Sequence, residues 1–169
     1  PIFLSATGNS LSTSTMRDRE FVNRFCAFQL LGLERYRGDM DEYLANGLRL
    51  MNKMEPDDLQ KLRTQFHNGL ANNLRLFGKH AFRKHVEGQD YRSVINASLW
   101  DVMSTGLSRV PANVVDTQAG ALKSAFYPLL ADTEFSTSIT YGTNDTKRVM
   151  HRFLATRAMF QEVFGADAT

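Results

Sequence analysis

The sequence has a single cysteine, Cys26, and therefore cannot form an internal disulfide. Cys26 lies in the apolar run Phe25-Cys26-Ala27-Phe28, where we expect a buried thiol. A reactive thiol would need a cationic and partly exposed setting, which this run does not offer. The lack of a disulfide framework is consistent with a reducing compartment, and we expect the cytoplasm.

Long apolar runs are also missing. No run reaches the roughly 18 residues that a membrane-spanning helix needs, and no signal-peptide pattern is present, so we expect no membrane partner. The length of 169 residues and the hydrophobic fraction of 43% predict one globular domain. Because the first residue is Pro1 instead of methionine, we expect this chain to be the C-terminal part of a longer protein.

Motifs for catalysis and metal binding are absent as well. The chain has no Gly-x-Ser-x-Gly elbow, no glycine-rich phosphate loop and no His-x-x-x-His pair among His67, His80, His85 and His151. The sequence therefore predicts no metal site, no cofactor and no catalytic residue in this chain. The alternative is a catalytic group assembled in space from residues that are distant in the sequence, which local motifs do not reveal.

Apolar residues recur at helical spacing through most of the chain, as in Phe21, Phe25 and Phe28. No stretch alternates with the period of a strand. The pattern predicts an all-α fold, a compact bundle of about six helices within residues 16–169. These helices are expected at about 17–35, 39–51, 56–77, 93–109, 113–129 and 146–164. Residues 1–15 are expected to form a flexible lead-in, and residues 132–145 a loop, because both segments are rich in serine and threonine.

Residue types at the expected helix ends favour these boundaries. Asp39 is followed three residues later by a glutamate, which resembles a capping box, and Pro56 is suited to a first helical turn. Ser14 or Thr15 can cap the first helix, and Asn113 the fifth. Pro128 is expected to end or kink the fifth helix.

Charge is unevenly distributed along the chain, although the net charge is only +2. Residues 38–58 contain six acids and two bases, whereas residues 61–92 contain seven bases and two acids. The candidate contacts to nucleic acid or phosphate are the basic residues of segment 79–85 and of the last helix: Lys79, Arg83, Lys84, Lys147, Arg148 and Arg152. The alternative is that each group is a solvated helix face.

A second candidate set consists of polar residues inside apolar helices. It contains Arg17, Asp18, Glu20, Arg24, Asn96 and Asp101. An arginine in an apolar helix often joins helices through charge-assisted hydrogen bonds, and phosphate binding is the alternative for Arg24. Asn96 and Asp101 either satisfy helix ends and internal polar contacts or lie beside an active site on another domain.

Several of these residues belong to motifs that carry a family resemblance. The motifs are Met16–Phe28, Tyr36–Leu44, Phe77–Arg83, Ile95–Asp101 and Thr143–Phe153. Taken in this order, they resemble the C-terminal helical half of the ParB-like domain found in bacterial GmrSD-type restriction proteins. The residues that match the family pattern are Arg17, Asp18, Glu20, Arg24, Arg83, Asn96, Asp101 and Arg152.

The resemblance implies a function for the parent protein. Its N-terminal half would carry an Asp-Gly-Gln-Gln-Arg motif linked to nucleotide hydrolysis and DNA cleavage, and would use a nucleotide and a divalent metal. This chain lacks that motif, so activity cannot be carried over to it. The implied role is an accessory helical domain that supports the ParB-like half of the same protein and contacts DNA. The alternative is a structural or oligomerising module without a nucleic-acid role.

Overall fold

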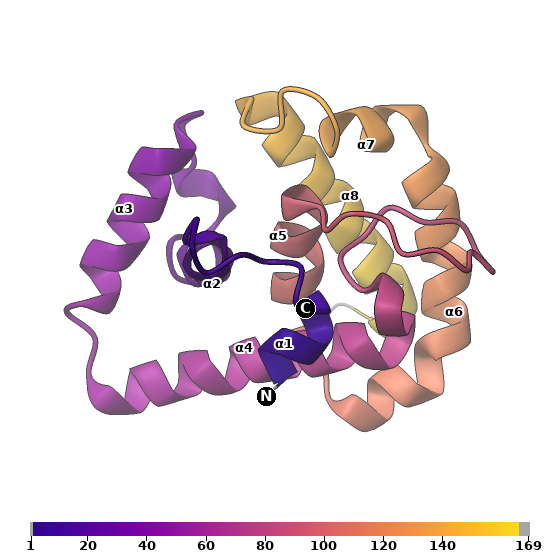
Figure 1. The fold of residues 1–169 in the computed structure, drawn as a ribbon, viewed down its shortest axis with the longest axis horizontal. Helices are drawn as coiled ribbons and strands as arrows, with labels where there is room; N and C mark the ends of the chain where they lie inside the picture. Colours follow the sequence, from indigo (N-terminus) through magenta and orange to yellow (C-terminus); the bar gives the residue numbers. More distant parts are fainter. Residues whose placement is uncertain (1, 166–169) are drawn as a thin grey trace.

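The computed structural model describes residues 2–165, which form an all-α bundle (Figure 1). The long helices are α2 (Arg17–Leu31), α3 (Met40–Met51), α4 (Pro56–Phe77), α5 (Ala97–Gly106), α6 (Ala112–Ala131) and α8 (Thr146–Phe164). The short elements are α1 (Ile2–Thr7), α7 (Thr133–Ser138) and the 3-10 turns η1 (Leu33–Arg35) and η2 (Gly78–His80). No strand occurs within residues 2–165, so the predicted all-α fold with six main helices is confirmed.

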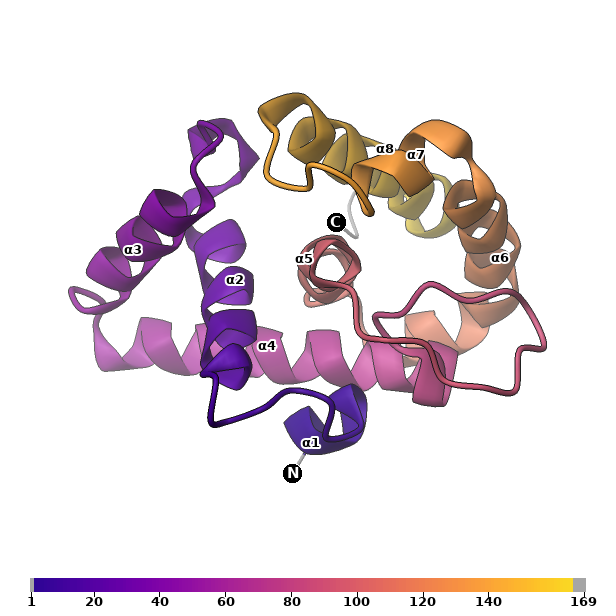
Figure 2. The ribbon, with the colours of Figure 1, turned by 45° about the horizontal axis from the view of Figure 1, so that its top comes forward.

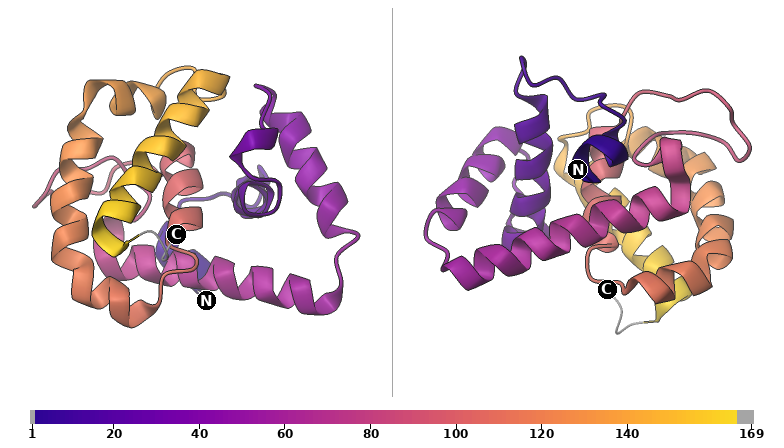
Figure 3. Two further views of the ribbon diagram at one scale, coloured as in Figure 1. Left: turned by 180° about the vertical axis from the view of Figure 1, so that it is seen from behind. Right: turned by 60° about the horizontal axis from the view of Figure 1, so that its bottom comes forward.

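Helix α5 lies at the centre of the bundle (Figure 2). It contacts α2, α4 and α8, and every residue from Ser98 to Ser104 is buried. α2 and α3 form one end of the molecule and α6, α7 and α8 form the other, while the long helix α4 runs beneath both (Figures 1 and 3). A helix that is buried on all sides forces its polar residues to find partners inside the protein.

Two glycines allow the helices to approach closely. A Cβ added at Gly69 of α4 would collide with the backbone oxygen of Ser104 on α5. A Cβ at Gly47 of α3 would lie 2.8 Å from the Cβ of Ala27 on α2. The helix propensity that Gly47 loses relative to alanine is thus offset by close packing between α2 and α3.

The helix ends agree only in part with the predicted caps. Asp39 accepts a hydrogen bond from the Glu42 backbone N–H at 3.0 Å, as predicted. The predicted caps at Ser14, Thr15 and Asn113 are wrong, because α2 begins after Met16 in a left-handed conformation and α6 begins after Pro111. Neither of these two helices has a hydrogen bond from a capping side chain at its start.

The segment 132–145 is not a continuous loop as predicted. Asp132 accepts a hydrogen bond from the Phe135 N–H at 2.8 Å and begins the short helix α7, in which Phe135 is fully buried. The helix before it, α6, continues through Pro128 to Ala131. Pro128 lacks the N–H that would bond to the carbonyl oxygen of residue 124, but only three helical residues follow it.

The predicted lead-in, residues 1–15, needs a correction for residues 2–11. Residues 2–7 form helix α1, which packs against α4, and both Ala6 and Leu11 are buried. The ring centroid of Phe3 lies 6.0 Å from that of Trp100 on α5. This short helix is held by tertiary contacts, since six residues are too few for a stable isolated helix.

Residue 1 and residues 166–169, which belong to the predicted lead-in and domain ranges, lie outside the described residues. Within the described part of the chain, no helix combines the length and the apolar character that crossing a membrane requires.

Candidate functional site

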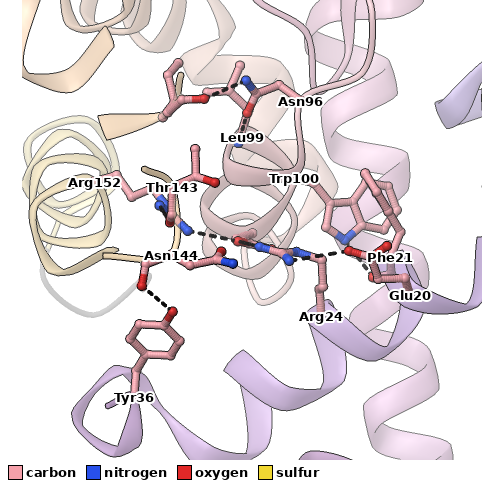
Figure 4. Close-up of polar contacts among 12 residues, drawn as sticks. Glu20, Phe21, Arg24, Tyr36, Asn96, Leu99, Trp100, Thr143, Asn144 and Arg152 are labelled. Atoms are coloured by element: carbon pink, nitrogen blue, oxygen red, sulfur yellow. Dashed lines mark hydrogen bonds and ion pairs between the residues drawn. The ribbon is translucent and has the colours of Figure 1, made fainter. Parts of the chain in front are cut away.

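Three charged residues, Arg24, Asp101 and Arg152, meet where α2, α5 and α8 come together, and Figure 4 labels the two arginines. The guanidinium of Arg24 on α2 donates two hydrogen bonds to the carboxylate of Asp101 on α5, with Nε to Oδ1 at 2.8 Å and Nη2 to Oδ2 at 2.6 Å. Arg152 on α8 donates from Nη2 to the same Oδ2 at 3.2 Å. We call these three residues the buried triad, and it joins α2, α5 and α8.

Further polar contacts extend the triad towards the surface (Figure 4). Arg24 forms a second ion pair with half-exposed Glu20 at 3.6 Å. The Nη1 atom of Arg152 donates to the backbone oxygen of Thr143 at 2.6 Å. Beside it, the Tyr36 hydroxyl donates to the Asn144 oxygen at 2.6 Å. The loop before α8 is therefore held from both α8 and the α2–α3 connection.

The pKa values of the two arginines in the triad shift in opposite directions. For Arg24, burial lowers the pKa, but the charge of Asp101 and the two hydrogen bonds to it outweigh this cost, so the pKa rises. For Arg152, burial is again the main cause, Asp101 compensates only in part, and the positive charge of Arg24 adds to the reduction, so the pKa falls. The paired hydrogen bonds make Arg24 the principal partner of Asp101.

The buried triad is closed to solvent. Arg24 is 5% exposed, and Asp101 and Arg152 are 0% exposed. A substrate could not reach the carboxylate without separating the helices, so the triad acts as a structural junction. This geometry agrees with the helix-joining interpretation of Arg24 and the internal-contact interpretation of Asp101 made from the sequence.

The other residues of the second candidate set lie elsewhere. Asn96 caps α5 by accepting from the Leu99 N–H, and its amide donates to the Ile139 oxygen (Figure 4). Arg17 is exposed, with its guanidinium carbon 5.6 Å from the centre of the Phe21 ring. Asp18 is half-buried on α2 and forms no ion pair within residues 2–165. The set therefore does not form one site.

Arg83 and Arg152 need a correction as candidate nucleic-acid contacts, because both side chains are buried. The guanidinium of Arg83 donates to the oxygens of Thr7, Ala81 and Ser93 and to the Ser10 hydroxyl, at 2.7–2.8 Å. Burial lowers the pKa of Arg83, which has no carboxylate partner within residues 2–165. Arg83 thus fastens α1 to the chain that follows α4.

Replacing Arg83 with glutamine is expected to loosen α1. Two of its four hydrogen bonds hold Thr7 and Ser10, so the free energy of unfolding should fall by about 2 kcal/mol. Amide hydrogen exchange should become faster across residues 2–11. The matched control is Arg92→Gln, since Arg92 is exposed and its side chain donates a single hydrogen bond within residues 2–165, to the Gly8 oxygen at 3.2 Å. Unchanged exchange at residues 2–11 in the Arg83 variant would contradict this role.

The remaining basic candidates partly converge. Lys84 donates to the hydroxyls of Thr140 and Ser136 at 2.9 and 3.4 Å, which places it against α7 and the chain that follows it. Lys147 and Arg148, at the start of α8, line a surface groove whose other wall is α7. We call Lys84, Lys147 and Arg148 the α7 cations. Lys79 is exposed on η2, in the segment that leads to Lys84.

The groove between α7 and the start of α8 is not uniformly positive. Glu134 and Asp132 also line it, and Glu134 lies 3.5 Å from the imidazole of His151. The guanidinium of Arg148 donates to the Tyr141 oxygen, whereas Lys147 forms no side-chain hydrogen bond or ion pair within residues 2–165. Lys147 is thus the most accessible cation of this surface.

The remaining chemical candidates are the thiol of Cys26 and the side chain types that commonly bind metals. Burial raises the pKa of Cys26 to about 11, so its thiol stays protonated at neutral pH, as its apolar neighbours predicted. Within residues 2–165 no three His, Cys, Asp or Glu side chains are grouped as metal ligands would be.

Sequence reasoning missed two contributors to this polar framework. Tyr36 contacts Asn144 across 108 positions of the sequence, and Ser10 contacts Arg83 across 73. Tyr36 begins one of the motifs that carry the family resemblance, but neither it nor Ser10 was a candidate, because both partners are distant in the sequence.

Comparison of this chain with protein-family models, with curated proteins and with solved structures gives no match.

Proposed function

We propose that this chain is a helical accessory domain of a DNA-processing protein similar to the GmrSD-type restriction proteins. It would support a ParB-like NTPase and nuclease half in the same protein and contact DNA through the α7 cations. The ordered motifs in the sequence support the family assignment. The single observation that supports the DNA contact is the convergence of Lys84, Lys147 and Arg148 around α7.

The buried polar residues support the accessory role. The charged and amide side chains that match the family pattern are largely used within the fold: Arg24, Asp101 and Arg152 form the buried triad, Arg83 holds α1, and Asn96 caps α5. The resemblance therefore concerns residues that stabilise a helical framework. The catalytic chemistry of the family would belong to the other half of the protein.

The α7 cations come from two separate parts of the chain, the segment after η2 and the first turn of α8. Cations spaced along a surface attract the phosphate backbone without reading its sequence. Glu134 and Asp132, which line the groove together with Lys147 and Arg148, reduce this attraction. We therefore expect weak, sequence-independent binding, with a dissociation constant of about 10⁻⁴–10⁻⁶ M at moderate salt.

The proposal is tested by duplex DNA binding, measured by fluorescence anisotropy between about 50 and 200 mM salt. The variant Lys84→Glu/Lys147→Glu should abolish binding at the lower salt concentration, because two attractive contacts become repulsive. The matched control is Lys61→Glu/Arg63→Glu, which changes the net charge equally on α4, on the opposite side of the bundle from α7 (Figure 1). The control should retain most of the affinity.

The single variant Lys147→Glu separates a charge effect from damage to α7, since Lys147 makes no hydrogen bond that holds that helix. It should reduce both the affinity and the steepness of the salt dependence. Equal loss in the α4 control would mean that only net charge matters, and would contradict the proposed contact.

The alternative, an oligomerising module, is favoured by a different observation. Val86, Tyr91 and Val94 in the chain between η2 and α5 are 68%, 72% and 86% exposed. Apolar side chains gathered on one loop are typical of a contact with another protein. No DNA binding at low salt, together with a mass that rises with protein concentration, would favour this alternative.

A further inference from the structure

A second basic surface lies on α3 and the α2–α3 connection. A groove of about 480 Å³ is lined there by four cationic side chains, Arg35, Arg37, Arg49 and Lys53. Arg35 belongs to η1, Arg37 follows it, Arg49 lies in the last turn of α3 and Lys53 follows that helix. We call this surface the α3 groove. It shares no lining residue with the groove beside α7.

The α3 groove has no carboxylate among its lining residues. None of the four cations forms an ion pair within residues 2–165. The acids of α3, Asp41 and Glu42, lie in its first turn, outside the lining, where they complement the helix dipole. Four like charges facing one groove repel one another, and a bound anion would relieve that repulsion.

Two of the guanidiniums are held in place before any ligand arrives. Arg49 donates from Nη1 to the Asn46 side-chain oxygen at 2.7 Å. Arg37 donates from Nη1 to the backbone oxygens of Glu34 and Tyr36, at 2.6 and 3.0 Å. These bonds leave the other nitrogens of each guanidinium free to donate. Ordering side chains in advance reduces the entropy that binding would otherwise cost.

The floor of the α3 groove is uncharged, and its hydroxyl group already donates a hydrogen bond within the protein. It includes the buried side chains of Leu31 and Tyr43. The Tyr43 hydroxyl donates to the Gly32 oxygen at 2.9 Å and lies 3.3 Å from the Ala27 oxygen. Arginine forks above such a floor match the geometry of phosphate oxygens, which accept paired hydrogen bonds.

We propose that the α3 groove binds a compact anion that carries two or more adjacent phosphate groups. At neutral pH a terminal phosphate group carries a charge of about −1.5 to −2, and a bridging or backbone phosphate about −1, so several adjacent groups come closer to balancing four cations than one does. The volume lies in the range of small-molecule sites. Such phosphates come from two sources, a free nucleotide or polyphosphate and the backbone of a nucleic acid.

The first test is a calorimetric titration of the full 169-residue chain with inorganic tripolyphosphate, with orthophosphate for comparison at equal ionic strength. One molecule of tripolyphosphate should bind per chain, at least about tenfold more tightly than orthophosphate. In two-dimensional NMR spectra, the shifts that change should cluster on Arg35, Arg37, Asn46 and Arg49. No binding, or changes spread over the whole surface, would overturn the proposal.

The second test uses substitutions at exposed positions, which should leave the fold intact as judged by circular dichroism. Arg35→Gln/Arg49→Gln should weaken tripolyphosphate binding at least about tenfold, because each removes a charge-assisted contact. The matched control Lys61→Gln/Arg63→Gln removes the same charge from α4 and should change the affinity less than about twofold. Equal weakening by both pairs would mean diffuse attraction, and would overturn the proposal.

The third test separates this inference from the proposed DNA contact. The Lys84→Glu/Lys147→Glu variant should bind tripolyphosphate as well as the unaltered chain does. If it binds neither DNA nor tripolyphosphate, the α7 cations are the only anion site and the α3 groove is not one. A titration with ATP, repeated in the presence of duplex DNA, distinguishes the two sources of phosphate. If ATP binds in the groove and DNA does not displace it, the natural ligand is a free nucleotide. If DNA displaces ATP, the ligand is the phosphate backbone of a nucleic acid.

Discussion

Replacing Asp101 with asparagine is expected to lower the free energy of unfolding by about 3–5 kcal/mol. The amide has nearly the same shape as the carboxylate but no charge. It would leave Arg24 and Arg152, which are 5% and 0% exposed, without the anion that compensates for their burial. One asparagine N–H would also point towards a guanidinium donor. Both effects act at the junction of α2, α5 and α8.

Urea denaturation followed by circular dichroism measures this loss. The matched control is Asp116→Asn, since Asp116 pairs with Arg75 at 2.8 Å but both side chains are partly exposed, at 56% and 41%. A surface pair of this kind contributes less than about 1 kcal/mol. An Asp101 variant no less stable than the control would show that the buried triad contributes little to the fold.

Replacing Trp100 with alanine is expected to cost a similar amount, about 3–5 kcal/mol. Trp100 is fully buried, and its ring lies 4.6 to 6.1 Å from the ring centroids of Phe3, Phe21, Phe66 and Phe82. These four rings belong to α1, α2, α4 and the chain after η2. Truncation would leave a cavity where these elements meet, and the surrounding structure could close it only in part.

The variant Trp100→Phe divides this effect into packing and hydrogen bonding. It keeps an aromatic ring but loses the indole N–H that donates to the Phe21 oxygen at 2.8 Å, so a smaller loss of about 1–3 kcal/mol is expected. Thermal unfolding followed by circular dichroism suits both variants, because Trp100 is the single tryptophan and its fluorescence is lost on substitution. A Trp100→Ala loss no larger than that of Tyr91→Ala, at a 72% exposed position, would contradict the argument.

The helical framework was largely predictable from the sequence. The boundaries of α4 and α8 follow from local signals, namely Pro56 at the start of α4, Gly78 after its end and apolar spacing through both helices. Asp39 capped its helix as predicted. The errors occur where local signals are weak. α1 and α7 are only six residues long, and tertiary contacts stabilise them more than their own sequence does.

The surfaces and the buried network could not be predicted in the same way. Arg83 and Lys84 are neighbours in the sequence, yet the first is buried and the second lies against α7. The α3 groove lies within and just before a segment with net negative charge, because the acids occupy one end of α3 and the bases the other. Charge counted along a sequence does not show which face of a helix each charge occupies.

The sequence by itself determined that this chain is all-α and that Cys26 is buried, because periodicity and helix-end residues act over a few positions. It placed four of the main helices within about two residues, but the predicted helices 17–35 and 93–109 were too long, since α2 ends at Leu31 and α5 covers Ala97–Gly106. Only the tertiary structure decided which cations are structural and which reach solvent. Arg24, Arg83 and Arg152 are internal because they bond to residues that are distant in the sequence. Asp101 lies 77 positions from Arg24 and 51 positions from Arg152, and Thr7 lies 76 positions from Arg83. Those contacts form only once the helices have packed together.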